Sequence, residues 1–392
     1  MTALAPPLSG RPPVSAPGPR TRPSPRELGP NWYATVMGTA VVATTAAGLP
    51  LGPAVQPWLR AAATVVWAVT ALLLLGLLSA SAAQWIRHPG RVRDRLLDPA
   101  VAPFYGCPAM AFPALGAATL GVGGDVIGGG AALVTAAVLF AAGTATGLVV
   151  ATAIPYLMIT RHRTGPGSAT PVWLLPVVAP MVPAALGPQL VPHLPPGQAR
   201  EALLLGCLSL FGMSLLATLL ILPLVFARLV HDGPLPLALT PSLFLVLGPL
   251  GQSVTATGRL ADAAPGAVAA PYAGALSAFG VLYGVPVLGF ALLWLAVAAA
   301  LTARAVRRGM PFGMTWWACT FPVGTCVTGS AVLARHTGLV AYGWLAVALF
   351  VLLVAAWGVA GFRTVRGVLR GELLAAPRRA RPGPAPMTAR TR

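Results

Sequence analysis

Apolar segments follow one another from residue 32 to residue 362 with no polar block long enough to form a soluble domain between them. A helix that crosses the hydrocarbon core of a bilayer needs about 20 mostly apolar residues. Ten such segments can be placed between charged or Pro/Gly-rich breaks, at about 32–50, 60–84, 103–122, 131–159, 171–191, 200–227, 238–257, 270–302, 312–333 and 339–362. The sequence therefore predicts an all-α integral membrane protein with ten transmembrane helices.

Composition supports one membrane domain with two short tails. The chain of 392 residues is 56% hydrophobic and 9% charged, whereas about a quarter of the residues of a soluble domain carry a charge. Residues 1–30 hold nine prolines and no apolar core, so we expect a disordered cytoplasmic N-terminal tail. Residues 31–362 form the predicted ten-helix channel or transporter domain, and residues 363–392 a basic cytoplasmic C-terminal tail.

The arginines predict the orientation. All 26 basic residues are Arg, and 22 of them lie in the tails and in the loops that share the side of the tails. Because cytoplasmic loops carry the excess of positive charge, both tails are expected in the cytoplasm. The net charge of +18 then points to anionic lipid headgroups as partners and not to nucleic acid. A lysine-free chain is typical of a GC-rich bacterial genome, which favours the plasma (inner) membrane.

Ionisable groups are expected outside the predicted spans. Every Asp, Glu and His falls in a tail, in a loop or, for Glu201, at the edge of a span by this assignment. Proton pumps, cation carriers and intramembrane enzymes depend on such groups near the bilayer centre, so we expect none of these functions. The four cysteines lie in apolar stretches without a Cys/His cluster, which predicts free thiols, no metal site and no cofactor.

A Pro/Gly pattern recurs in the odd-numbered spans. The positions Gly38, Pro113, Pro180, Pro249 and Pro322 are 67 to 75 residues apart, one helix pair per step. Proline removes a backbone donor and kinks a helix, so each odd span is expected to break near its middle. Units that share one orientation can surround an axis along the membrane normal. We therefore predict five helical hairpins around a central pore; the alternative is that these residues serve helix packing alone.

The repeat also predicts which residues line the pore. A small anion needs a lined passage because its desolvation in hydrocarbon is prohibitive. Half-helices that restart after each kink would present partial positive charge to it, and hydroxyl and amide groups would add donors. The predicted pore-lining residues are Gly38, Thr39, Phe112, Pro113, Pro180, Gly248, Pro249, Gln252, Ser253, Thr320 and Pro322.

Several motifs resemble one family of membrane proteins. They are Trp32-Tyr-Ala-Thr-Val-Met-Gly-Thr39, the Pro171 to Pro180 stretch, Pro241-Ser-Leu-Phe244 with Gly248 to Ser253, and Trp316-Trp-Ala-Cys-Thr-Phe-Pro322. In this order they are similar to the tellurite-resistance/dicarboxylate transporter family, which includes the plant slow anion channel, the yeast malate permease and the yeast sulfite pump. The resemblance covers residues 31–362. Ala40 departs from it, because many relatives have Gly after Met-Gly-Thr.

The resemblance implies a fold, an assembly and a gate. It implies ten helices in five hairpins around a central pore, usually in homotrimers, with an aromatic ring that closes the pore. The Phe of the Thr-Phe-Pro motif is Phe321 here, so the resemblance assigns the gate to Phe321; the alternative is a packing role at a helix interface.

Three functional hypotheses remain open at this point. The first is a passive channel for small anions such as dicarboxylate, sulfite or an inorganic anion. The second is a proton-coupled or potential-driven carrier or exporter of a C4-dicarboxylate or sulfite. The third, of another class, is a membrane structural protein that transports nothing. The sequence specifies no particular anion.

Overall fold

The structure is a computed structural model that describes residues 28–371, except 53 and 166, together with residue 373. The described residues form helices and connecting loops, with no β-strand among them. Most of the two predicted tails lies outside the described residues.

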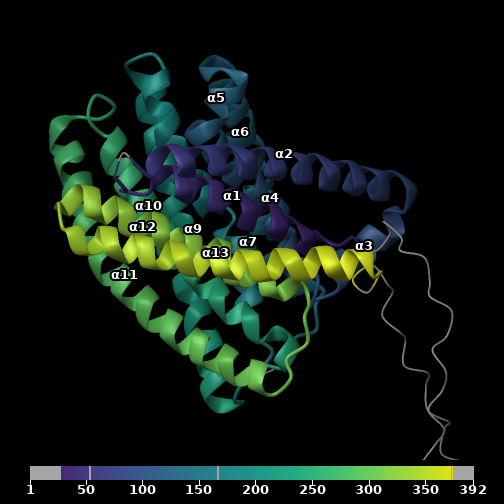
Figure 1. The fold of residues 1–392 in the computed structure, drawn as a ribbon. Coiled ribbons are helices and arrows are strands. Elements are labelled where there is room, and N and C mark those ends of the chain that lie inside the picture. The colour runs from purple at the N-terminus through teal and green to yellow at the C-terminus, as the bar shows by residue number, and fades with distance from the viewer. Residues whose placement is uncertain (1–27, 53, 166, 372, 374–392) are drawn as a thin grey trace, which may run out of the picture.

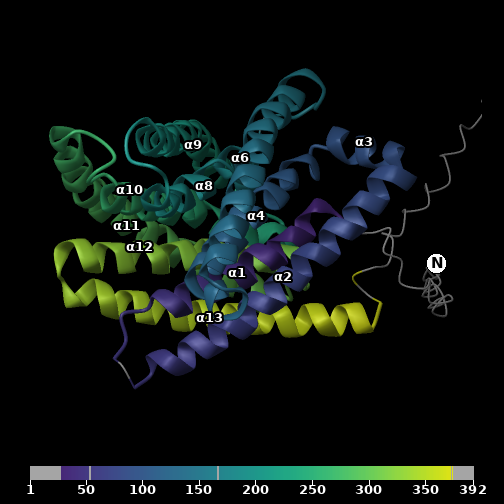
Figure 2. The same cartoon turned by 90° about the horizontal axis from the view of Figure 1, so that it is seen from above.

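Five long apolar helices form the outer part of the molecule (Figures 1 and 2). These outer helices are α2 (Gln56–Arg87), α6 (Gly129–Thr160), α9 (Gln198–His231), α11 (Ala270–Arg307) and α13 (Val340–Leu369). Only 17% to 28% of the most apolar stretch of each is buried. Large apolar side chains that remain exposed over such lengths indicate a surface that faces lipid.

Five shorter and more segmented elements form the interior. In the elements that begin at Leu237 and Met314, 78% and 83% of the most apolar stretch is buried. The inner elements are η2–α1 (Pro30–Trp32, Tyr33–Gly48), η3–α4–η4–α5 (Ala102–Tyr105, Gly106–Ala118, Thr119–Gly123, Gly124–Ile127), η5–α7–α8–η6 (Pro171–Trp173, Leu174–Val178, Met181–Leu186, Gly187–His193), η7–α10 (Leu237–Val246, Leu247–Ala263) and η8–α12 (Met314–Cys319, Phe321–Thr337).

Inner and outer elements alternate along the chain and pack in a regular order. Among the inner elements, α1 contacts α4, α4 contacts α8, α8 contacts α10, α10 contacts α12, and α12 returns to α1. Each inner element also packs against the outer helix that follows it: α1 on α2, α4 on α6, α8 on α9, α10 on α11 and α12 on α13. The inner contacts therefore close into a ring.

Each of the ten predicted segments contains a helix, but not every one passes a strict criterion for a membrane span. Eight helices among the described residues are long and apolar enough to cross a bilayer, or nine if the bent pair from Pro171 to His193 counts as one span. The remaining segment, α1, has 16 residues and is largely buried by its neighbours. Ten separate crossings remain a prediction.

Prolines affect the inner elements unequally. The element from Pro171 to His193 bends by 57° between Val178 and Met181, at Pro180. Both α10 and α12 begin within two residues before Pro249 and Pro322. In contrast, α1 runs unbroken through Gly38 and α4 runs unbroken through Pro113, so the expected breaks at these two positions of the first and third spans are wrong. The segment between the first two hairpins also contains a helix that we did not expect, the amphipathic α3 (Pro89–Leu97).

Candidate functional site

Two cavities lie among the inner elements, and Phe321 borders both. The first, which we call the apolar cavity, is lined by residues from all five inner elements. They are Asn31, Ala34, Met37, Phe104, Cys107, Met110, Leu174, Leu175, Val178, Ser242, Leu245, Gly248, Met314, Thr315, Trp317, Ala318, Phe321 and Pro322.

The second cavity, which we call the polar cavity, also receives residues from all five inner elements. Its walls carry hydroxyl, amide and guanidinium groups and no carboxylate. They are formed by Val41, Thr44, Pro113, Ala114, Ala117, Val182, Ala185, Leu186, Gln189, Gln252, Thr255, Arg259, Phe321 and Thr328.

The two cavities follow one face of each inner element. In four of the five elements the apolar-cavity residues precede the polar-cavity residues, and in the fifth the two sets meet at Phe321. All five inner elements therefore run in the same direction past this site. On α10, for example, Gly248, Gln252, Thr255 and Arg259 succeed one another at intervals of three or four residues, which places them on one face of the helix.

Phe321 is the first residue of α12 and its side chain is buried, with 6% exposure. The preceding residue, Thr320, has φ −104° and ψ −80°, outside the α-helical range. The chain therefore leaves the 3₁₀ turn η8 at Thr320 and starts a new helix with Phe321. The Thr320 hydroxyl donates to the Trp317 carbonyl at 2.6 Å, which fixes this joint.

The structure distributes the predicted pore residues over two environments. Gly248 and Pro322 line the apolar cavity, and Pro113 and Gln252 line the polar cavity. The other seven line neither of these two cavities: Gly38, Thr39, Phe112, Pro180, Pro249, Ser253 and Thr320.

Contacts with other helices explain several of these placements. The Thr39 hydroxyl accepts a hydrogen bond from Trp357 of α13 at 3.1 Å, and the Ser253 hydroxyl accepts one from Tyr283 of α11 at 2.8 Å. Both residues are therefore directed at outer helices. Gly38 has no such role: a Cβ atom there would collide with the Thr320 hydroxyl, so its small size permits α1 and α12 to approach closely.

Sequence reasoning missed the charged member of the site. We expected Arg259 in a loop beyond a span ending near 257, but α10 continues to Ala263 and carries Arg259 into the wall of the polar cavity. Asp262 and His336, also expected in loops, lie on α10 and α12. The spacing of Gln252, Thr255 and Arg259 was the available signal, since it continues a helical face beyond the apolar stretch.

A family model matches most of the chain. The model of the voltage-dependent anion channel family (SLAC1) matches residues 27–365. The chain belongs to this family. The resemblance noted from the sequence is thereby confirmed, and with at least eight apolar helices long enough to span a bilayer, the family member is a multi-pass membrane protein.

Three relatives of this family member cover most of its length. It is 25% identical to an uncharacterized transporter of Methanocaldococcus jannaschii, over 88% of this chain and 94% of the relative. It is 26% identical to the sulfite efflux pump of Arthroderma otae, over 84% of this chain and 87% of the pump. The sulfite efflux pump of Trichophyton rubrum is also 26% identical, over 78% and 82% of the two chains.

Proposed function

We propose that this chain conducts small anions across the membrane through the two cavities, with Phe321 as the gate between them. The observation that carries the proposal is the position of Phe321. Its ring borders a cavity on each side, and each cavity is walled by all five inner elements. If the five hairpins surround a common axis, displacement of the Phe321 ring would join the two cavities into one pathway.

The chemistry of the walls favours anions. Neither cavity is lined by a carboxylate, and the polar cavity carries Arg259 together with amide and hydroxyl donors. A cation would meet a positive charge there without a compensating ligand, whereas an anion would find hydrogen-bond donors. Membership of an anion channel family supports the same selectivity.

Replacing Phe321 by Ala tests the gate. Removal of the ring would join the cavities, so we expect Phe321→Ala to raise basal anion conductance in planar bilayers several-fold over the unmodified chain. Phe226→Ala is the matched control, because Phe226 is 57% exposed on the outer helix α9, and it should leave conductance unchanged. An unaltered conductance in Phe321→Ala would show that the ring serves packing instead.

A carrier is the second candidate, favoured by the sulfite efflux pumps among the relatives. Export of sulfite or a C4-dicarboxylate could be driven by the membrane potential or coupled to protons. Flux of sulfite and malate into proteoliposomes, measured with and without an imposed pH gradient, tests for proton coupling. A proton-coupled carrier responds to the pH gradient, a passive channel or a potential-driven carrier responds to the membrane potential instead, and a structural protein gives no flux of either anion.

The proposal includes an orientation and an assembly. We place the protein in the plasma membrane with both ends in the cytoplasm and the chain in homotrimers. One structural feature supports the shared side of the ends: Leu28 and Trp32 border the same outer groove as Val368 and Leu369. The apolar cavity, near the start of each inner element, would then open toward the cytoplasm.

A further inference from the structure

Arg259 occupies an unusual position for a charged side chain. It lies on α10, one turn before the helix ends, and lines the polar cavity. Its Nε atom is buried and has no hydrogen-bond partner among the described residues. A buried cationic donor without a partner costs free energy. The guanidinium would therefore be stabilised by a hydrogen-bond acceptor that the chain does not provide.

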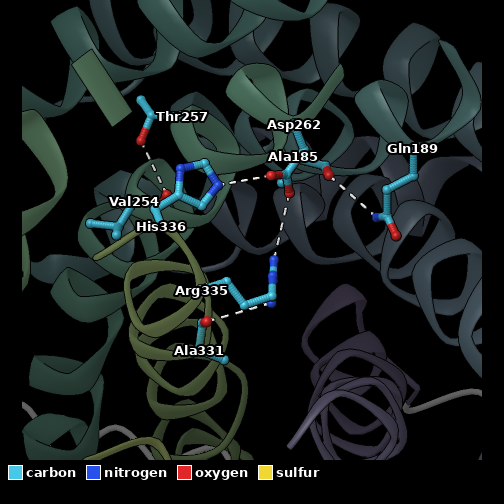
Figure 3. A network of polar contacts seen from close by, with 8 residues as sticks. All are labelled: Ala185, Gln189, Val254, Thr257, Asp262, Ala331, Arg335 and His336. Atoms are coloured by element: carbon cyan, nitrogen blue, oxygen red, sulfur yellow. Dashed lines mark hydrogen bonds and ion pairs between the residues drawn. The ribbon is translucent and has the colours of Figure 1, made fainter. Parts of the chain in front are cut away.

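The nearest acidic group is engaged elsewhere (Figure 3). One Asp262 carboxylate oxygen lies 2.8 Å from His336 Nε2, and the other pairs with the Arg335 guanidinium at 3.6 Å. No ion pair joins Asp262 to Arg259 among the described residues. Two arginines therefore face one carboxylate at this end of the inner ring, which leaves the cluster with positive charge.

Neutral donors surround the same space. The Gln252 carboxamide lines the cavity and makes no hydrogen bond with any described residue. Gln189, on the neighbouring element η6, donates only a long bond of 3.5 Å to the Ala185 carbonyl. The Thr255 and Thr328 hydroxyls are 2.7 Å apart. The wall thus offers one guanidinium and two amides whose donors are weakly used.

We propose that Arg259, with Gln252 and Gln189, is the anion-binding site of the pathway and that it selects oxyanions over halides. This rests on the proposed function and adds a residue that confers selectivity. The planar guanidinium presents parallel N–H groups that match two oxygens of one anion, and amides can satisfy a third. A spherical chloride uses only part of this geometry. The site lies on the far side of Phe321 from the apolar cavity.

Anion binding to the purified full-length protein tests the site without requiring transport. Thermal unfolding in detergent would be followed in sodium gluconate during titration with sodium sulfite, nitrate or chloride, because an anion that binds the folded state raises the melting temperature. For Arg259→Gln we expect the half-saturating sulfite concentration to rise about tenfold or more, the range for loss of a charge-assisted hydrogen bond. Arg259→Lys should retain part of the binding and lose the preference for sulfite and nitrate over chloride.

Arg60→Gln provides the matched control. It removes one positive charge from an exposed ion pair with Asp125 that lies outside both cavities, so the sulfite titration should stay within about twofold of the unmodified chain. If Arg259 served the fold alone, Arg259→Gln would lower the melting temperature in gluconate and leave the half-saturating concentration unchanged. That result, or equal titrations for Arg259→Gln and the unmodified chain, would overturn the proposal.

The two proposals fail in different ways. Sulfite binding that depends on Arg259, without flux through the unmodified chain or Phe321→Ala in liposomes, would overturn the pathway and keep the binding site. Flux that is raised by Phe321→Ala, with sulfite binding unaffected by Arg259→Gln, would keep the pathway and overturn the binding site.

Discussion

Two glycines on one helix differ in whether their surroundings leave room for a side chain. Gly248 and Gly251 are three positions apart on α10. A Cβ atom at Gly251 would lie 2.6 Å from the backbone nitrogen of Cys326, whereas one at Gly248 would meet nothing within 4 Å, because that face borders the apolar cavity. Gly251 permits close packing of α10 on α12, and Gly248 leaves the apolar cavity open.

Alanine should therefore destabilise the protein at Gly251 and have little effect at Gly248. Gly251→Ala forces a backbone against a methyl group, and we expect a loss of about 1–3 kcal/mol, the usual cost of overpacking. Gly248→Ala adds a methyl group to open space and should change stability by less than about 1 kcal/mol. Thermal unfolding of both variants in the same detergent makes the comparison, and equal melting temperatures would contradict the assigned packing.

The sequence could not predict which pore residues face the axis, because the rotation of each helix about its own axis was unknown. Proline and glycine positions mark the inner elements, but a position in the sequence does not say which side of a helix faces the axis. Thr39 and Ser253 turn to outer helices through bonds to Trp357 and Tyr283, partners that come from distant parts of the chain. Arg259 was missed because the end of α10 was placed too early.

At the scale of elements, each inner unit begins with a 3₁₀ segment. These are η2, η3, η5, η7 and η8, and an α-helix follows each of them directly or after one residue. Poorer hydrogen-bond geometry makes 3₁₀ runs depend on neighbours, and outer helices supply some of that support. The buried Trp294 of α11 donates its indole N–H to the Leu243 carbonyl of η7 at 2.9 Å.

Replacing Trp294 by Phe tests this support. The Leu243 carbonyl would lose its donor, and interhelical hydrogen bonds in membrane proteins contribute about 0.6 kcal/mol on average and up to about 1.7 kcal/mol. We expect a loss within that range, measured by unfolding in increasing denaturing detergent. Trp344→Phe on α13, at a side chain that is 68% exposed, should lower stability less than Trp294→Phe does. A greater loss in Trp344→Phe would contradict the stabilising role of the Trp294 indole hydrogen bond.

Element order was largely predictable because apolar length and Pro/Gly breaks are local signals. All ten predicted segments contain helices. The 3₁₀ starts, the π-helical turn η4 and the joint at Thr320 were not predictable, since they arise from packing between elements that are distant in sequence.

At the scale of the whole molecule, the arginine distribution predicts which side faces the cytoplasm. A reporter protein that fluoresces only in the cytoplasm should be bright when fused to either end of the chain. The same reporter inserted in the loop of residues 264–269, between α10 and α11, should be dark because that loop follows the opposite end of an inner element. Fluorescence of bacterial cells measures both, and a bright loop insertion with dark ends would reverse the orientation.

The common direction of the five inner elements gives the molecule two chemically unlike cavities. One is lined mainly by aliphatic and aromatic side chains, and the other carries Arg259, amides and hydroxyls. In the proposed pathway, an anion that enters through the polar cavity would be concentrated before it reaches Phe321, and one that enters through the apolar cavity would not. Current through the open pathway should therefore rectify, with unequal magnitudes at equal and opposite voltages in symmetric salt.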